Sequence, residues 1–205
     1  MSKIKIAYLY LLFVFIILFA FGCAQTQSVN SQISGGGKSF FPHNDGYTWR
    51  SRDTYGDITY STFEGTKIIN SKTTQIFRSC IIEPSGNIIT SEVYYIINDS
   101  GFYDYPPEPM AFYNIYFTWL SFPLEVNKTW DVIRADTFVM TAKILAKESV
   151  VTPAGSFECY KVNYLSTSGT QERDNYNVWF GNNAGIVKSN SNSSTYESYL
   201  EWKNF

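Results

Sequence analysis

Runs in which apolar and polar residues alternate are the most constraining feature of this sequence, and they recur from residue 47 to residue 203. In one run Tyr176, Val178 and Phe180 are separated by single residues, and the last run, 196–203, alternates in the same way. Alternation places successive side chains on opposite faces of a strand, so each run predicts a strand with one buried face. Turn sequences separate the runs at 84–87, 98–101, 153–155 and 181–183. Because helical periodicity is rare, we expect an all-β fold of antiparallel strands.

Local patterns add expectations for single segments. In the first strand Trp49 lies on one face, and Arg50 and Arg52 lie on the other. The segment 88–98 is more evenly apolar, so we expect it to be buried on both faces. The segment 110–120 is dense in aromatic residues, and we expect a short helix there.

The N-terminus has the pattern of an export signal. Lys3 and Lys5 precede an unbroken apolar run, 6–21, which Gly22 and Cys23 follow. Residues 20–23 resemble the lipobox of bacterial lipoproteins, which implies cleavage after residue 22 and lipidation of Cys23. A plain signal peptide or signal anchor is the alternative.

The chain then divides into a tether and one domain. Residues 23–39 are polar and rich in Gly, Ser, Asn and Gln, which is typical of a flexible tether behind the lipidated cysteine. Residues 40–205 are long enough to form one domain with its own core.

An internal similarity suggests two related halves. Phe41-Pro42 precedes Trp49 by the same spacing as Phe122-Pro123 precedes Trp130, at an offset of 81 residues. Each half also contains a Pro-x-Gly turn, at 84–86 and 153–155. We therefore expect the domain to contain two related sets of strands.

Three motifs resemble those of uncharacterised bacterial lipoproteins. They are the opening Phe41-Pro42-x-x-x-Gly46-x-x-Trp49, the hairpin Thr152-Pro153-Ala154-Gly155-x-Phe157-x-Cys159, and the late Trp179-Phe180 followed by Gly185-Ile186-Val187-Lys188. The resemblance implies a curved antiparallel sheet or a half-open β-barrel, distantly similar to periplasmic lipoprotein carriers. It implies no activity, since that family has none assigned.

Charge and histidine content exclude several classes of function. The chain has 16 Lys+Arg, 18 Asp+Glu and one His, a net charge of -2. Nucleic-acid binders normally carry a basic excess, so we expect no nucleic-acid partner. A single histidine, His43, cannot form a multi-histidine metal site, and its place beside Pro42 suggests an exposed loop. We therefore expect no metal and no cofactor.

Candidate catalytic groups are few. Two acidic groups could supply the carboxyl pair of a hydrolase: Asp45, Asp53 and Asp57, and then Asp99, Asp104 and Glu108. Acidic residues in turns are commonly only solvated, so we expect the protein not to be an enzyme.

Cys80 and Cys159 lie in strand-like runs. Export permits a disulfide between them, and two buried free thiols are the alternative.

Aromatic residues around the proline cluster at 106–109 form the one compositional excess that suggests a ligand site. The candidates for a concave aromatic surface that receives a saccharide or an acyl chain are Tyr103, Tyr105, Tyr113, Tyr116 and Trp119. The alternative is that these side chains fill a β core.

The sequence leaves three functional hypotheses for a lipoprotein held at a bacterial membrane through Cys23, in the outer membrane if the source is Gram-negative. The first is a non-enzymatic binding or assembly module with an envelope protein as partner. The second is a carrier or binder of a lipophilic or saccharide ligand. The third is a hydrolase that uses an acidic pair.

Overall fold

The structure, a computed structural model, describes residues 38–105 and 116–205. These ranges contain one short 3-10 helix, η1 (Lys38–Phe40), and twelve strands. The strands are β1 (Thr48–Asp53), β2 (Ile58–Ile69), β3 (Lys72–Ile82), β4 (Ile88–Asn98), β5 (Gly101–Asp104), β6 (Phe117–Ser121), β7 (Thr129–Ala135), β8 (Phe138–Thr152), β9 (Gly155–Ser168), β10 (Gln171–Gly181), β11 (Gly185–Ser191) and β12 (Glu197–Lys203). The all-β prediction is confirmed. No helix among the described residues is long and apolar enough to cross a membrane.

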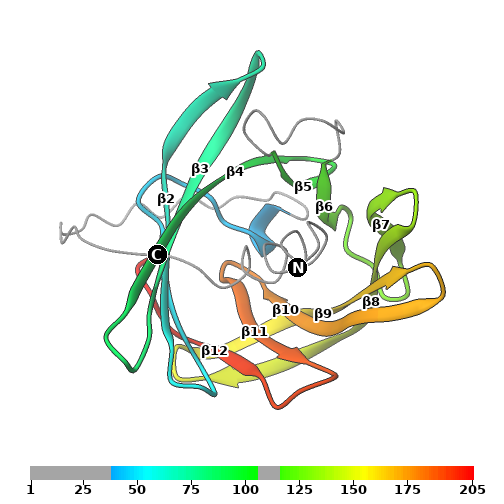
Figure 1. Cartoon of the computed structure of the whole chain (residues 1–205). Helices are drawn as coiled ribbons and strands as arrows, with labels where there is room; N and C mark the ends of the chain where they lie inside the picture. Colours follow the sequence, from blue (N-terminus) through cyan, green and yellow to red (C-terminus); the bar gives the residue numbers. More distant parts are fainter. Residues whose placement is uncertain (1–37, 106–115) are drawn as a thin grey trace.

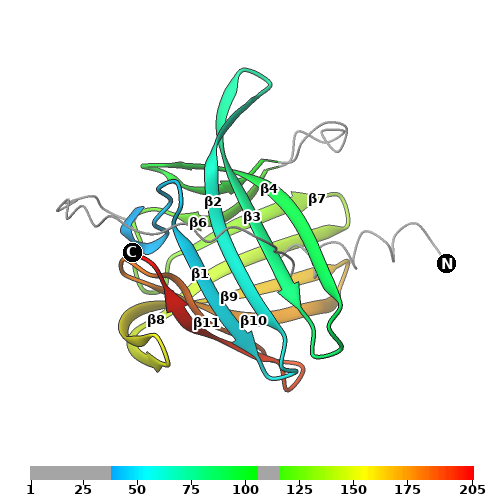
Figure 2. The same ribbon diagram turned by 90° about the vertical axis from the view of Figure 1, so that its left-hand side faces the viewer.

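All twelve strands belong to one antiparallel sheet with the order β6-β5-β4-β3-β2-β1-β12-β11-β10-β9-β8-β7. Each half of the chain is a six-stranded meander, and the pairing of β1 with β12 joins the two halves. The sheet curls on itself until β6 and β7 approach each other (Figures 1 and 2). The result is the expected half-open barrel, nearly closed and with one unsealed seam between β6 and β7.

Side chains bridge this seam in place of a backbone ladder. The Trp130 Nε1–H on β7 donates to the Thr118 carbonyl on β6 at 2.7 Å. The Tyr164 hydroxyl on β9 donates to the neighbouring Trp119 carbonyl at 2.6 Å. Carbonyls at the β6 edge are therefore satisfied although that edge has no strand partner.

The strand faces follow the sequence pattern in β1. Trp49 is buried, while Arg50 and Arg52 reach across to Glu201 on β12 at 3.1 and 2.6 Å. The opposite orientation of Trp49 and the two arginines is therefore confirmed.

The two halves are related at the offset that the sequence predicts. β1 begins at Thr48 and β7 begins 81 residues later, at Thr129. The residue two positions before each strand, Gly46 or Asn127, has a positive φ of 81° or 72°. Asn tolerates this left-handed conformation better than most residues, so it can replace Gly at the second turn.

Backbone hydrogen bonds repeat at the same offset. Gly46 N donates to Phe63 O at 2.8 Å, and Asn127 N donates to Ile144 O at 2.8 Å. In return, Phe63 N donates to Tyr47 O, and Ile144 N donates to Lys128 O. The pairings β2–β3 and β8–β9 also shift register directly after Phe63 and Ile144.

Three finer expectations were wrong. The Pro-x-Gly turns are not equivalent, because 84–86 joins the third and fourth strands of its half, whereas 153–155 joins the second and third. β4 has the expected bounds but is mostly exposed in its first half, since only Tyr94 and Tyr95 are buried. The helix expected over 110–120 is absent where the structure describes that segment, because residues from 117 onward pair with β5 as strand β6.

Aromatic rings fill the interior at the end where the N-terminal segment enters. Phe41 follows η1, and its ring lies 4.0–6.4 Å from six other rings between centroids. Those rings belong to Trp49, Phe63, Phe77, Tyr95, Phe102 and Phe180. Ser39, which the sequence assigns to the tether, accepts a hydrogen bond from Asn183 N at 2.6 Å. The opening motif therefore closes this end of the barrel.

Candidate functional site

Two cavities in the barrel interior are the candidates for a functional site. A small cavity of about 100 Å³, the aromatic cavity, is lined by aromatic side chains, hydroxyls, aliphatic side chains and Lys188. The aromatic side chains are Phe41, Trp49, Phe77, Tyr95, Phe102 and Trp119. The hydroxyls belong to Ser51, Thr59, Ser61, Ser79, Ser189 and Ser198.

A larger cavity of about 430 Å³, the mouth cavity, lies at the β1–β2 and β11–β12 turns. Ser189 and Tyr196 line both cavities, so the two adjoin. The other residues of its lining are Asp53, Tyr55, Asp57, Met140, Asp174, Asn175, Tyr176, Val178, Asn190, Ser191, Ser193 and Ser194. The site is thus built from two turns, β1–β2 and β11–β12, and from strands β8, β10 and β11, which meet because β1 pairs with β12.

Carboxyl groups dominate the electrostatics of the mouth cavity. Asp53 Oδ1 accepts hydrogen bonds from the backbone N–H groups of Tyr55 and Asp57, at 2.9 and 3.0 Å, and this fixes the β1–β2 turn. Burial raises the pKa of Asp57, and the charges of Asp53 and Glu83 raise it further. Asp174 accepts a hydrogen bond from Ser166 Oγ at 2.9 Å.

Two tyrosines of the cavity are held as neutral phenols. Burial raises the pKa of Tyr196 to about 12, and the charge of Asp53 adds to the effect. Burial likewise raises the pKa of Tyr176, as does the charge of Asp174. Near neutral pH both hydroxyls therefore keep their protons, and both rings keep the electron-rich faces of a neutral phenol.

The structure divides the first acidic group expected from the sequence. Asp53 and Asp57 line the mouth cavity, whereas Asp45 does not. Asp174 completes the carboxyl set, and sequence reasoning missed it because it comes from β10, more than 100 residues away. His43 lies in the N-terminal segment, where its Nδ1 is 3.0 Å from the Phe41 carbonyl oxygen.

The second acidic group does not form one site among the described residues. Asp99 lies in the β4–β5 turn, Asp104 lies on β5, and Glu108 lies outside the described residues. Burial raises the pKa of Asp104 to about 7, against a smaller lowering effect of the hydrogen bond from the Tyr105 backbone. Across residues 38–105 and 116–205, no three His, Cys, Asp or Glu side chains are placed to share a metal ion.

The aromatic residues proposed from the sequence lie in different places. Tyr105 and Tyr116 stack at 5.2 Å, and Tyr105 belongs to a small core with Ile69 and Tyr94. Trp119 instead belongs to the main core and lines the aromatic cavity.

The remaining two candidates, Tyr103 and Tyr113, are not part of the Tyr105–Tyr116 pair. The Tyr103 hydroxyl donates to Ser100 Oγ at 3.0 Å, and Tyr113 lies outside the described residues. Among the four candidates that the structure describes, it therefore brings together only Tyr105 and Tyr116.

Both described cysteines are buried and free. Cys80 lies on β3 and Cys159 on β9, and five strands separate these two in the sheet. Burial raises the pKa of the Cys80 thiol to about 11 and that of Cys159 to about 12, with Glu158 and Glu148 adding to the second. Both thiols therefore keep their protons near neutral pH, and a protonated thiol is a poor nucleophile.

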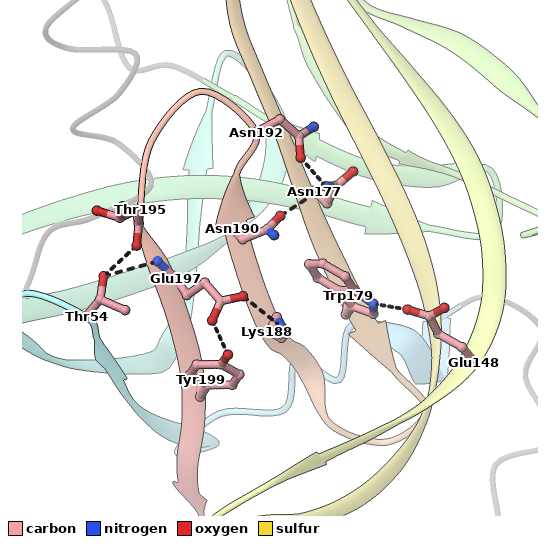
Figure 3. Close-up of polar contacts among 10 residues, drawn as sticks. All are labelled: Thr54, Glu148, Asn177, Trp179, Lys188, Asn190, Asn192, Thr195, Glu197 and Tyr199. Atoms are coloured by element: carbon pink, nitrogen blue, oxygen red, sulfur yellow. Dashed lines mark hydrogen bonds and ion pairs between the residues drawn. The ribbon is translucent and has the colours of Figure 1, made fainter.

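A second polar region, the outer network, connects β8, β10, β11 and β12 (Figure 3). Trp179 Nε1 donates to Glu148 at 2.6 Å, and the ring lies 4.8 Å from Lys161 Nζ and 5.1 Å from Lys188 Nζ. Lys188 also pairs with Glu197 at 2.9 Å.

The asparagine side chains of the outer network form hydrogen bonds with one another. Asn177 Nδ2 donates to Asn190 and Asn192 at 3.0 and 2.7 Å (Figure 3). Because these polar groups already bond one another, the outer network stabilises the sheet and offers few free groups to a ligand. The mouth cavity is the better candidate site.

Comparisons with known proteins agree with this fold. A family described as DUF3108-like matches residues 124–197, which is about a third of the chain and runs from the β6–β7 connection to the first residue of β12. No curated protein matches the sequence.

Two crystal structures have a similar fold. A provisionally assigned lipoprotein of Parabacteroides distasonis is 18% identical, with a TM-score of 0.53, over 80% of this chain and 98% of that one. A provisionally assigned exported protein of Bacteroides fragilis, with a YmcC-like fold, is 16% identical, with a TM-score of 0.54, over 81% of this chain and 99% of that one. The chain therefore shares its overall fold with both proteins and resembles the DUF3108-like family in its second half.

Proposed function

We propose that this protein is a lipid-anchored lipoprotein of a bacterial envelope that binds a small polar ligand in the mouth cavity. The mouth cavity is the observation that carries the proposal. Its volume of about 430 Å³ lies within the range of about 300–1,000 Å³ that is typical of small-molecule sites. Its lining combines ring faces with hydroxyl, amide and carboxyl groups, which suits a ligand with several polar groups.

The envelope location rests on the N-terminus and on the structural relatives. The signal and Cys23 lie outside the described residues, and their pattern supports lipidation. Both similar crystal structures are of proteins assigned to export or lipidation. In a Gram-negative source we expect the outer membrane.

The carboxyl groups of the mouth cavity, Asp53, Asp57 and Asp174, favour a polar ligand over a lipophilic one, because an acyl chain would desolvate them without bonding them. An apolar cavity of about 150 Å³ holds a benzene ring. The aromatic cavity is smaller, about 100 Å³, so it is too small to hold an acyl chain.

The assembly hypothesis has less support. The large apolar side chains exposed among the described residues lie on separate elements, for example Ile68 on β2, Val151 on β8 and Trp202 on β12. A protein-docking surface normally gathers such side chains into one patch. We propose binding without catalysis.

Native mass spectrometry of the full chain, extracted in mild detergent, tests the proposal. We expect a retained small ligand in the wild type and its loss from Ser189→Phe, which fills the wall shared by both cavities. The matched control is Ser149→Phe, because Ser149 is an exposed serine of β8. Thermal unfolding of both variants verifies that they are folded. A ligand kept by Ser189→Phe, or a wild type without any ligand, contradicts the proposal.

A further inference from the structure

The lining of the mouth cavity has an unbalanced charge. Asp53, Asp57 and Asp174 contribute three carboxyl groups, and the lining includes no Lys, Arg or His. None of the ion pairs found between described residues involves any of the three. A cationic group that enters the cavity therefore meets negative charge that no protein cation there neutralises.

Aromatic rings in the same cavity point independently to a cation. Tyr55, Tyr176 and Tyr196 all line it. The Tyr55 and Tyr196 rings lie 6.0 Å apart between centroids and are inclined at 37°, so they form an open angle at the rim. Neutral phenol rings attract cations to their faces, and aromatic surfaces of this kind recognise quaternary ammonium groups.

The arrangement does not suit a metal ion. Metal binding needs several ligands within about 2.0–2.6 Å of one point, and no such group of three His, Cys, Asp or Glu exists in the described part of the chain. The carboxyl groups are instead distributed around a space of about 430 Å³. An organic cation can extend across such a space, and hydroxyls such as those of Ser189 and Ser191 can bond its polar portion.

We infer that the mouth cavity binds a small organic cation, an amine or quaternary ammonium compound, with its positive group between Asp53, Asp57 and the ring of Tyr55. This inference rests on the proposed function, and it specifies the class of ligand. The β1–β2 turn, from Asp53 to Asp57, supplies all three contacts, while β8, β10, β11 and the β11–β12 turn supply the walls that enclose the rest of the ligand.

Calorimetric titration of the full chain in detergent tests the inference with matched probes. The cations are choline and spermidine, and the neutral probe is 3,3-dimethyl-1-butanol, in which carbon replaces the choline nitrogen. We expect at least one cation to bind, and the neutral probe to bind at least about tenfold more weakly than choline, or not at all.

Two variants locate the positive group. Asp53→Asn/Asp57→Asn removes both charges, and because the amide oxygen introduced at position 53 can still accept the turn's backbone hydrogen bonds, the turn is kept. Tyr55→Leu removes a ring that is 60% exposed, so the fold does not depend on it. Each should weaken cation binding by about tenfold or more, whereas Asp131→Asn, on β7 and paired with Arg134, should leave binding unchanged.

The outcomes separate this inference from the proposed function. Equal binding of choline and its neutral analogue, or cation binding that the Asp53→Asn/Asp57→Asn variant leaves intact, overturns the inference. A retained neutral or anionic ligand that Ser189→Phe loses, together with no cation binding, also overturns it but supports the proposed function. The absence of any ligand or probe binding overturns both.

Discussion

At the residue scale, Phe41 links the N-terminal segment to the barrel interior through contacts with six aromatic rings. Its removal leaves a cavity that rings from both halves of the barrel cannot easily collapse to fill. We expect Phe41→Ala to lower the free energy of unfolding by about 3–5 kcal/mol. Urea denaturation measures the change. Val151→Ala, at a side chain that is 76% exposed, should stay within about 0.5 kcal/mol, and an equal effect of both substitutions would contradict the role of Phe41.

Asp104 makes the stability of the folded protein depend on pH. Burial raises its pKa from 3.8 to about 7, so the folded protein keeps a proton that the unfolded chain has lost between these values. The contribution of Asp104 is therefore most favourable below pH 4, and it declines as the pH rises to about 7.

Asp104→Asn removes this titration. We expect the variant to be more stable than the wild type at pH 8 by roughly 1–2 kcal/mol, because it carries no buried charge there, and the contact of Asp104 with solvent limits the effect. The difference should diminish toward pH 4. Urea denaturation at pH 8 and pH 4.5 measures it, and a difference that is the same at both values would show that Asp104 titrates normally.

At the scale of elements, the seam is where the sheet relies on single side-chain hydrogen bonds. Trp130→Phe keeps an aromatic ring on β7 but removes the N–H that donates to Thr118 on β6. We expect faster amide hydrogen exchange in β6 and β7 and a loss of about 1 kcal/mol in the free energy of unfolding. Trp202→Phe, at a ring that is 48% exposed on β12, is the control. Exchange that remains as slow as in the wild type would mean that the Trp130 bond does not hold the seam.

Sequence patterns predicted some elements better than others. Alternation located β10 and β12, and the repeated Phe-Pro and Trp placed β1 and β7, because these signals are local to one strand. The expected helix near residue 117 was wrong because pairing with β5 decides the state of that segment, and aromatic content favours strands as readily as helices. The prediction that the two Pro-x-Gly turns are equivalent was wrong for a related reason. A turn sequence determines local backbone geometry, but it does not determine which strands the turn joins.

At the scale of the whole molecule, the candidate site exists only because the sheet closes. Asp57 and Asp174 are far apart in the chain, and they share a cavity because β1 pairs with β12 while β10 lies two strands further on. The sequence could identify Asp53 and Asp57 as neighbours in one turn. It could not identify Asp174, Tyr176 or Ser189 as their partners, because strand order in a twelve-stranded sheet is set by long-range pairing.

The location of the molecule depends on a segment outside the described residues. Lipid on Cys23 is the membrane attachment that the lipobox pattern suggests, and a net charge of -2 gives little attraction to anionic lipid. We therefore expect Cys23→Ser to move the protein from the membrane fraction to the soluble fraction of lysed cells, because an attachment through acyl chains is lost with the sulfur that carries them. Immunoblotting of the two fractions measures the shift. Gln25→Ala, two residues further on, should remain with the membranes. A Cys23→Ser protein that still sediments with membranes would mean that the apolar segment 6–21 stays attached as a signal anchor.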